Sequence, residues 1–273
     1  DGEPVDVVEM GVPEPPVAVT AGHRVRASLG VSPDVVLFAA FGKVTPEKRV
    51  EQVLRALASL PSETPWHMML CGDEVNHYDS RADARGFGVS DRVTVTGYIH
   101  EDEMPGYLNA ADVCVSLRWP SSRETSASWL RCLAAGKPTI VTDLLHLTDV
   151  RSLDPRDWKV AGYPARPDAV GPVVSAACIG IDIVDEDHSL RLALRRISAD
   201  RDLRDTLGRA ARRLWTDRFT LEGMAVGYAR VMDRIIGTRA DVPRPGELPP
   251  HLRADGTELA GALVADFGLD NPL

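Results

Sequence analysis

The sequence predicts an α/β fold, in which a parallel β-sheet is covered by helices on both faces and is followed by C-terminal helices. Residues 21–184 alternate short apolar runs with amphipathic stretches, which is typical of parallel strands joined by right-handed helical crossovers. One run, residues 35–42 (VVLFAAFG), is apolar throughout, as in a strand buried on both faces. After Asp185 the pattern changes to successive helical segments with charged polar faces, at residues 185–197, 202–215 and 221–236.

Length and composition fit a globular protein with a sizeable core, since the chain has 273 residues, of which 44% are hydrophobic and 26% charged. The net charge of −9 argues against a general nucleic-acid-binding or anionic-membrane surface, although local basic clusters can still bind phosphate. No apolar run has the length of a membrane span, and no signal peptide is recognisable. The cysteines lie far apart in apolar contexts, which favours buried thiols in a cytoplasmic protein over a zinc site; they are Cys71, Cys114, Cys132 and Cys178.

The chain divides into four parts. Residues 1–20 are proline-rich and are expected to form a strand at residues 5–8 and a linker. Residues 21–184 form the sheet domain. Residues 185–237 form helices that pack on it or on a preceding domain, and residues 238–273 form a docking arm or a disordered tail.

The elements of the sheet domain follow from hydrophobic periodicity and from stop signals. Strands are expected at residues 35–42, 67–71, 93–97, 113–117 and 138–142, with a last strand within residues 176–184. Helices are expected at residues 23–29, 101–111 and 127–135. A further helix begins with Thr45 as N-cap and Pro46 as first residue, and its apolar face comprises Val50, Val53, Leu54, Leu57 and Leu60.

Residues 117–143 (LRWPSSRETSASWLRCLAAGKPTIVTD) predict a ligand site. The preceding strand stops before Pro120, a polar run ends at Ser126, and the helix that follows stops at Gly136. A polar loop that leads into a helix N-terminus, at the carboxyl end of a buried strand, is where open α/β sheets bind anionic ligands.

Three segments, in this order and spacing, resemble the C-terminal, nucleotide-sugar-binding half of retaining GT-B glycosyltransferases of the family 4 type. They are FGKVTPEKR at residues 41–49, VTVTGYIHEDEMPGYLNAADVCVSL at residues 93–117, and RETSASWLRCLAAGKPTIVTD at residues 123–143. The resemblance covers about residues 35–236.

This resemblance implies a Rossmann-like domain of an enzyme of carbohydrate biosynthesis. The enzyme would move a hexosyl group from a nucleotide diphosphate sugar to an acceptor with retention of configuration, without a bound metal or other cofactor. It also implies a preceding acceptor-binding domain, without which this chain would be inactive. The nucleotide base, the sugar and the acceptor remain open.

The resemblance assigns roles in catalysis to Lys43, Lys48 and Glu124. The two lysines would neutralise the departing diphosphate, which gains negative charge as it leaves; the alternative is a pair of solvated surface lysines. Glu124 would accept hydrogen bonds from the sugar hydroxyls, or it is only a glutamate that stabilises the start of a helix.

Further residues are expected around the donor. Thr125, Ser126 and Ala127 can offer backbone N–H groups to phosphate, and Gly42 permits close approach of the backbone to a ligand or simply forms a turn. The resemblance places the base beside Tyr98 and Ile99, whose alternative is ordinary packing at a strand end. These positions, with Arg131, complete the expected binding residues.

One departure from the family concerns its second glutamate, expected eight residues after the first. Counting from Glu124 gives Cys132, whereas counting back from the Ala-Ala-Gly gives Arg131 and puts Arg123 at the first glutamate. Arg131 either adds positive charge near the phosphates or is a helix-surface arginine. The departure favours a second hypothesis, a non-catalytic nucleotide-sugar-binding or interaction module. A third, a sugar-nucleotide epimerase, would need acid/base groups that the sequence does not place.

Overall fold

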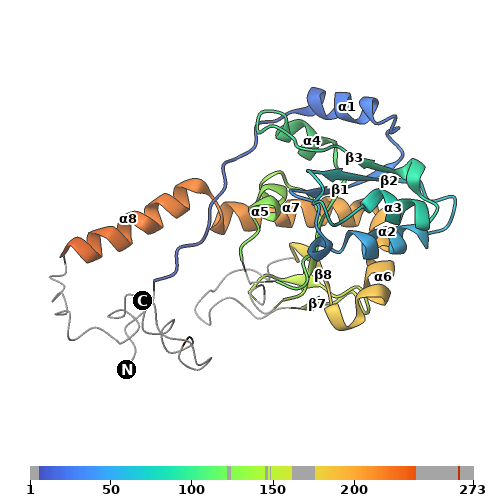
Figure 1. The fold of residues 1–273 in the computed structure, drawn as a ribbon. Coiled ribbons are helices and arrows are strands. Elements are labelled where there is room, and N and C mark those ends of the chain that lie inside the picture. The colour runs from blue at the N-terminus through green and yellow to red at the C-terminus, as the bar shows by residue number, and fades with distance from the viewer. Residues whose placement is uncertain are drawn as a thin grey trace. The chain divides into compact units, whose positions relative to one another are not determined.

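The computed structural model describes residues 6–121, 124–144, 147, 149–161, 176–237 and 264. Arg123 and nearly all of the predicted tail lie outside these residues. Residues 1–227 form one compact unit and residues 228–273 a second; of the second, the described part is mainly the end of a helix. Figure 1 shows the elements of the first unit, which carries the sheet.

The described residues contain an eight-stranded sheet in the order β3-β2-β1-β4-β5-β8-β6-β7. All neighbours pair in parallel except β6 and β7, which are antiparallel. The strands are β1 (Val36–Phe41), β2 (Trp66–Cys71), β3 (Val93–Val95), β4 (Val113–Ser116), β5 (Thr139–Thr142), β6 (Ser152–Leu153), β7 (Val160–Ala161) and β8 (Cys178–Ile181). The predicted parallel sheet is therefore confirmed. β6 and β7 were not predicted, because two residues are too few to show a hydrophobic period.

The helices are α1 (Val19–Ser28), α2 (Val50–Ala58), α3 (Ser80–Gly86), α4 (Met104–Ala110), α5 (Ala127–Ala134), α6 (Glu186–Ala199), α7 (Arg201–Arg218) and α8 (Leu221–Gly237). Seven of them correspond to predicted helices, and the three C-terminal helices are confirmed. The helix α3 was missed because it has only seven residues and few apolar ones. Its start does carry a signal, since the Asp79 side chain accepts a hydrogen bond from the Ala82 N–H.

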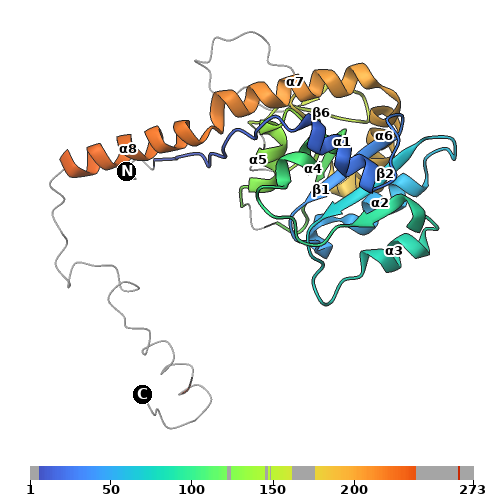
Figure 2. The ribbon, with the colours of Figure 1, turned by 90° about the horizontal axis from the view of Figure 1, so that it is seen from above.

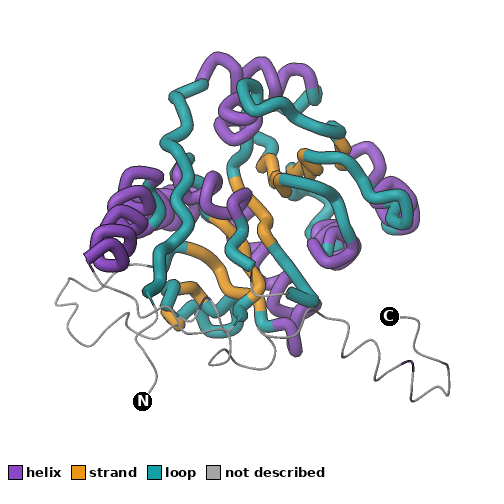
Figure 3. The backbone as a smooth tube through the Cα atoms, turned by 60° about the vertical axis from the view of Figure 1, so that its left-hand side comes forward, coloured by secondary structure: helices purple, strands orange, loops and turns teal. Residues whose placement is uncertain are grey.

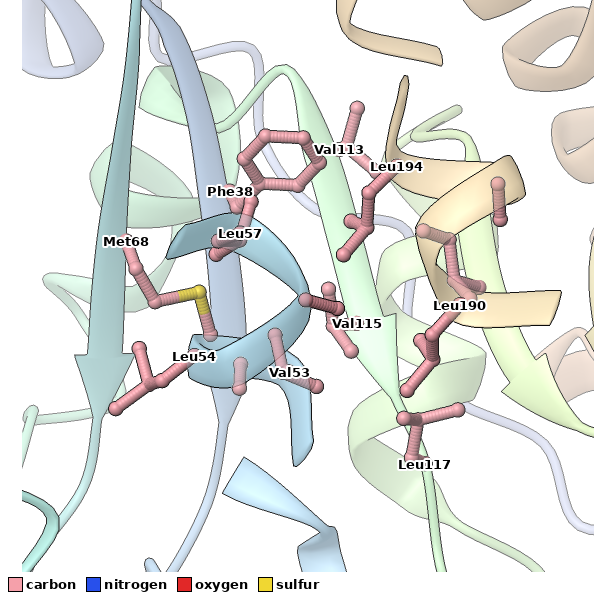
Figure 4. Packing of buried hydrophobic residues seen from close by; sticks show 14 of the residues in the cluster. Phe38, Val53, Leu54, Leu57, Met68, Val113, Val115, Leu117, Leu190 and Leu194 are labelled. Carbon is pink, nitrogen blue, oxygen red and sulfur yellow. The ribbon is translucent and has the colours of Figure 1, made fainter. Parts of the chain in front are cut away.

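The strands form a middle layer between helices (Figure 3). On β1, Phe38 faces a buried cluster formed with α2, α3 and α6, whereas Leu37 faces another formed with α1 and α4. Figure 4 shows Phe38 close to Leu57 of α2 and Leu194 of α6. Burial on both faces explains why residues 35–42 are apolar throughout.

A third buried cluster joins α5 to α7, which lies beside it in Figure 2. It contains Trp129 of α5 and Trp215 of α7. The same cluster includes Val12, whose N–H donates to the Phe219 carbonyl at 2.9 Å and whose carbonyl accepts from the Trp215 indole at 3.3 Å. The segment that leads into the domain is thus tied to the end of α7.

Two local expectations were wrong. Residues 6–10 form no strand, and Val7 is 83% exposed; the first β-bridge joins Val12 to Thr220. The helix expected from Thr45 is split into a 3-10 turn, Pro46–Lys48, and α2. Arg49 lies between them with φ 58° and ψ 31°, a left-handed conformation that interrupts a right-handed helix.

The strand order fixes where a ligand site is expected. From β1 the chain moves through β2 to β3 on one side and then returns to β4 on the other side of β1. The order therefore reverses between β1 and β4, and the crevice outside their carboxyl ends is where open α/β sheets bind ligands.

Candidate functional site

A cavity of about 330 Å³ lies at the carboxyl ends of β1, β4 and β5. Its wall includes Phe41, Leu117 and Thr142, which end or follow these three strands, together with the N-terminal residues of α5. Four predicted site residues line it: Lys48, Glu124, Thr125 and Ser126. Arg118, Ser128, Glu9, Asp149 and Arg218 line it too, so the cavity collects polar side chains from several separate segments.

Lys48 and Gly42 are neighbours in this site. The Lys48 Nζ donates a hydrogen bond to the Phe41 carbonyl at 2.5 Å. Gly42 has φ +86°, and a Cβ there would lie 2.9 Å from the Lys48 Nζ and 3.1 Å from the Ser128 Oγ. The backbone conformation therefore favours glycine, and a larger residue would also displace the Lys48 and Ser128 side chains.

Burial and, to a smaller extent, the positive charge of Arg118 lower the pKa of Lys48 to about 8. The cost of holding two cations near one another in a partly buried cavity falls when an anion binds between them. Lys43 behaves differently, because it is exposed and is not among the residues that line the cavity.

The loop after β4 is held by its backbone. The Arg118 N–H donates to the Thr142 Oγ1 at 3.0 Å, and the Trp119 N–H donates to the Glu47 carbonyl at 2.7 Å. These bonds attach the loop to β5 and to the 3-10 turn that carries Lys48. The side chain of Arg118 then donates to the Glu124 carboxylate, whose second oxygen lies 3.4 Å from the Ser121 Oγ.

The N-terminus of α5 completes the site. Ser126 is its N-cap, with a side chain that accepts from the Trp129 N–H at 3.3 Å. Ala127 and Ser128 are the first two helical residues, and the first four N–H groups of a helix have no intrahelical partner. Ser128 was missed by the sequence reasoning; its place two residues after the N-cap was the available signal.

Five predicted binding residues are not among those that line the cavity. Gly42 and Ala127 adjoin lining residues in the sequence, whereas Tyr98, Ile99 and Arg131 do not. Tyr98 is 68% exposed, and its N–H donates to the Asp73 carboxylate at 2.9 Å. Ile99 is buried in the core cluster of the α4 side. Arg131 donates to Glu101 at 2.9 Å, so its guanidinium is engaged in an ion pair.

The remaining candidates carry structural roles. All four cysteines are buried free thiols, as predicted. Burial raises the pKa of the Cys178 thiol to about 12. The acidic run at Asp185 starts α6, as expected for a helix N-terminus, and Glu186 accepts a hydrogen bond from Arg49.

Within the described residues, no group of three or more His, Cys, Asp and Glu side chains is arranged to hold a metal. No described helix is long and apolar enough to cross a membrane.

Known proteins are similar to this chain in sequence and in fold. Residues 33–161 match the family described as Glycosyl transferases group 1. The alpha-monoglucosyldiacylglycerol synthase of Streptococcus pneumoniae is 28% identical over 181 residues, which cover 65% of this chain and 39% of that protein. The chain therefore spans well under half of that relative.

Solved structures show the same fold. Anabaena Alr3699/HepE in complex with UDP-glucose has a TM-score of 0.65 at 14% identity, over 85% of this chain and 57% of that chain. The C-terminal domain of a Francisella tularensis glycosyl transferase group 1 protein, LpcC, has a TM-score of 0.54 at 15% identity, over 77% of this chain and 100% of that domain. The fold and the family match agree: residues 33–161 match the glycosyl transferases group 1 family, and the chain has the Rossmann-like fold of GT-B glycosyltransferase structures.

Proposed function

We propose that this chain is the donor-binding half of a retaining glycosyltransferase, and that the cavity at the carboxyl ends of β1, β4 and β5 holds the diphosphate of a nucleotide sugar. One observation carries the proposal: Lys48, Arg118 and the N-terminus of α5 converge on one cavity at the point where the strand order reverses. Cations and helix N–H groups together form a site for a doubly charged phosphate ligand.

In the proposed reaction the bond between the hexosyl C1 and the diphosphate oxygen breaks, and its electron pair goes to the diphosphate. Lys48 and Arg118 stabilise this added charge. Glu124 orients the sugar through its hydroxyl groups. The acceptor hydroxyl attacks C1 from the face that the diphosphate leaves, and its proton passes to the departing diphosphate oxygen. A further domain, of the kind found in family 4, would bind the acceptor. The donor is a substrate rather than a cofactor.

A second function, a non-catalytic nucleotide-sugar-binding module, is favoured by one contact. Of the two positions at which the second glutamate is expected, Cys132 and Arg131, neither is acidic, and Arg131 pairs with Glu101. Such a module would bind the donor but would not consume it.

Calorimetric titration with UDP, GDP, ADP and their sugars tests the donor site. We expect selective binding of one nucleotide, with UDP the first choice because the Anabaena structure contains UDP-glucose. Binding should be lost in Lys48→Ala and kept in Lys43→Ala, since only Lys48 lines the cavity. A folded chain that binds none of these nucleotides would contradict the proposal. Turnover of the bound donor by the protein together with its acceptor-binding domain would separate the enzyme from the module.

A further inference from the structure

A second, larger groove of about 870 Å³ lies at the amino ends of the central strands of the sheet. Its wall includes Asp112 and Pro138, which immediately precede β4 and β5. The first cavity lies at the carboxyl ends of the same strands, so the groove is separate from the proposed donor site. Its other wall is formed by α7.

Two glycines allow α7 to approach the turn between α5 and β5. Gly136 ends α5 with φ +64°, and a Cβ on Gly208 would lie only 2.4 Å from the Gly136 carbonyl oxygen. This contact brings the α7 arginines on both sides of Gly208 to the groove, among them Arg204 and Arg212.

The groove is strongly basic. Six cationic residues line it, against two acidic ones, Asp112 and Asp205, which leaves a local excess of four positive charges. The whole chain carries a net charge of −9, so this excess is local. The cations are Lys137, Arg201, Arg204, Arg209, Arg212 and Arg213.

Few of these charges are neutralised by carboxylates. Arg212 pairs with Glu14, and Asp112 is taken by Arg26. Lys137 and Arg204 are bound to main-chain carbonyls instead: Lys137 to Asn109 and Ala111 at 3.0 and 2.8 Å, and Arg204 to Ile197 and Ser198 at 2.6 and 2.9 Å. Such bonds fix the positions of these cations without cancelling their charge.

The remaining arginines project from the exposed side of α7. Arg201, Arg209 and Arg213 are exposed, and the Arg209 guanidinium donates a hydrogen bond to the Thr206 hydroxyl at 3.2 Å. Guanidinium groups offer paired N–H donors that match the oxygens of phosphate. A ligand that enters the groove therefore meets both cations held by main-chain carbonyls and exposed arginines.

We infer that this groove binds clustered phosphate groups, carried by one phosphorylated molecule or by neighbouring lipid headgroups. Several cations around one concave surface favour a polyvalent anion, because a single charge would leave most of their repulsion in place. The site is independent of the nucleotide-sugar cavity.

Calorimetric titration of the full chain with inositol hexakisphosphate at low salt tests this inference. The variant Arg209→Glu/Arg213→Glu should bind at least tenfold more weakly. The matched control Arg24→Glu/Arg195→Glu changes the net charge equally at exposed positions outside the groove and should bind as the wild type does. Absence of binding, or equal losses in both double variants, would overturn the inference.

Two further measurements locate the site. Lys48→Ala should retain the phosphate probe, and Arg209→Glu/Arg213→Glu should retain any nucleotide that the wild type binds. Failure of the donor proposal would leave the phosphate probe bound, so the two proposals fail separately. If Lys48→Ala no longer binds the phosphate probe, the probe occupies the donor cavity of the wild type, and the groove is not its binding site.

Ligand class and source are tested in the same way. Tricarballylate, a carboxylate trianion, should bind at least tenfold more weakly than pyrophosphate, whose charge is similar near neutral pH; equal affinity would contradict a phosphate site. Flotation with phosphatidylglycerol vesicles, lost in Arg209→Glu/Arg213→Glu, would assign the phosphates to lipid headgroups. Failure to float, with the soluble probes bound, would assign them to a soluble phosphorylated ligand.

Discussion

Arg118 and Glu124 are joined across the donor cavity, with the Arg118 Nη1 2.5 Å from the Glu124 Oε1. Both side chains are partly exposed, at 36% and 40%. The proposed donor needs each of them for a different purpose, since the diphosphate attracts the guanidinium and the sugar hydroxyls need the carboxylate. Donor binding would therefore exchange this ion pair for two contacts with the ligand.

Replacement of Arg118 by glutamine should weaken UDP binding about tenfold, the equivalent of ~1.4 kcal/mol for a charge-assisted hydrogen bond. Uridine, which has no phosphate, should bind the variant and the wild type equally. Calorimetry with both ligands measures the difference, and Arg118→Lys serves as the charge-conserving control. Unchanged UDP affinity in Arg118→Gln would remove Arg118 from the phosphate site.

Glu124→Gln, unlike Arg118→Gln, should not weaken UDP binding. The substitution removes a negative charge next to Arg118, so UDP should bind as well as to the wild type or more tightly. The extra affinity of the sugar nucleotide over UDP should shrink, because the amide is a weaker acceptor than the carboxylate. The control is Glu101→Gln, which removes a carboxylate that does not line the cavity. A loss of UDP affinity in Glu124→Gln would contradict the assigned role.

The pH dependence of binding should reflect Lys48. Burial, with Arg118 nearby, lowers its pKa from 10.5 to about 8, so the cation is lost as the pH rises through 8. UDP affinity should fall between pH 7 and 9, where the phosphate is already fully ionised. Titrations at several pH values should show this fall in the wild type and not in Lys48→Met. An identical fall in both proteins would assign it to another group.

The same shift affects stability. Because the pKa of Lys48 is lower in the folded chain than in the unfolded one, the charged form is penalised by folding. The free energy of unfolding contributed by this group should therefore increase as the pH rises from about 8 to about 10.5. Urea denaturation of the wild type and Lys48→Met across this range measures the contribution.

Gly42→Ala should be more harmful than Gly30→Ala. Both glycines have positive φ, +86° and +65°, but a Cβ at Gly30 has no atom within 4 Å, whereas at Gly42 it meets Lys48 and Ser128. Left-handed backbone costs about 1–2 kcal/mol in either alanine variant, and crowding adds to that cost only at Gly42. Urea denaturation compares the two, and UDP titration should show a loss of affinity for Gly42→Ala alone. Equal behaviour would mean that Lys48 and Ser128 move aside.

Arg49 offers a test of backbone strain against an ion pair. It is left-handed with φ 58°, and its guanidinium donates to the nearly buried Glu186. Arg49→Ala loses the pair and keeps the strain, while Arg49→Gly loses the pair and relieves the strain. We expect Arg49→Gly to be about 1 kcal/mol more stable than Arg49→Ala. Equal free energies of unfolding would show that the conformation is not strained.

Most of the sheet could be predicted because a strand buried on both faces must be apolar along its whole length, as in residues 35–42. The pairing of β6 with β8 could not, since Ser152 and Leu153 carry no periodic signal and owe their conformation to the neighbouring strand. The break at Arg49 was missed for a similar reason. Its left-handed conformation accompanies a contact with Glu186, 137 residues away, and local propensity does not include such contacts.

The location of the cavity at the ends of β1, β4 and β5 could be predicted from strand ends and helix starts, but which of the two lysines after β1 lines it could not. Lys43 and Lys48 are both basic residues that follow β1, and the sequence gives them the same status. Only the 3-10 turn Pro46–Lys48 brings Lys48 under Gly42. The predicted roles of Tyr98, Ile99 and Arg131 remain predictions, since these residues lie outside the cavity lining.

The contact between Val12 and the end of α7 has a mechanical consequence. The Val12 N–H is bonded to the Phe219 carbonyl, and a Cβ on Gly11 would lie 2.3 Å from the Thr220 carbonyl oxygen. The whole sheet therefore lies in a loop of chain that closes at this contact. A force that pulls residue 11 away from residue 220 is resisted there first, and the strands bear no load until the contact has opened.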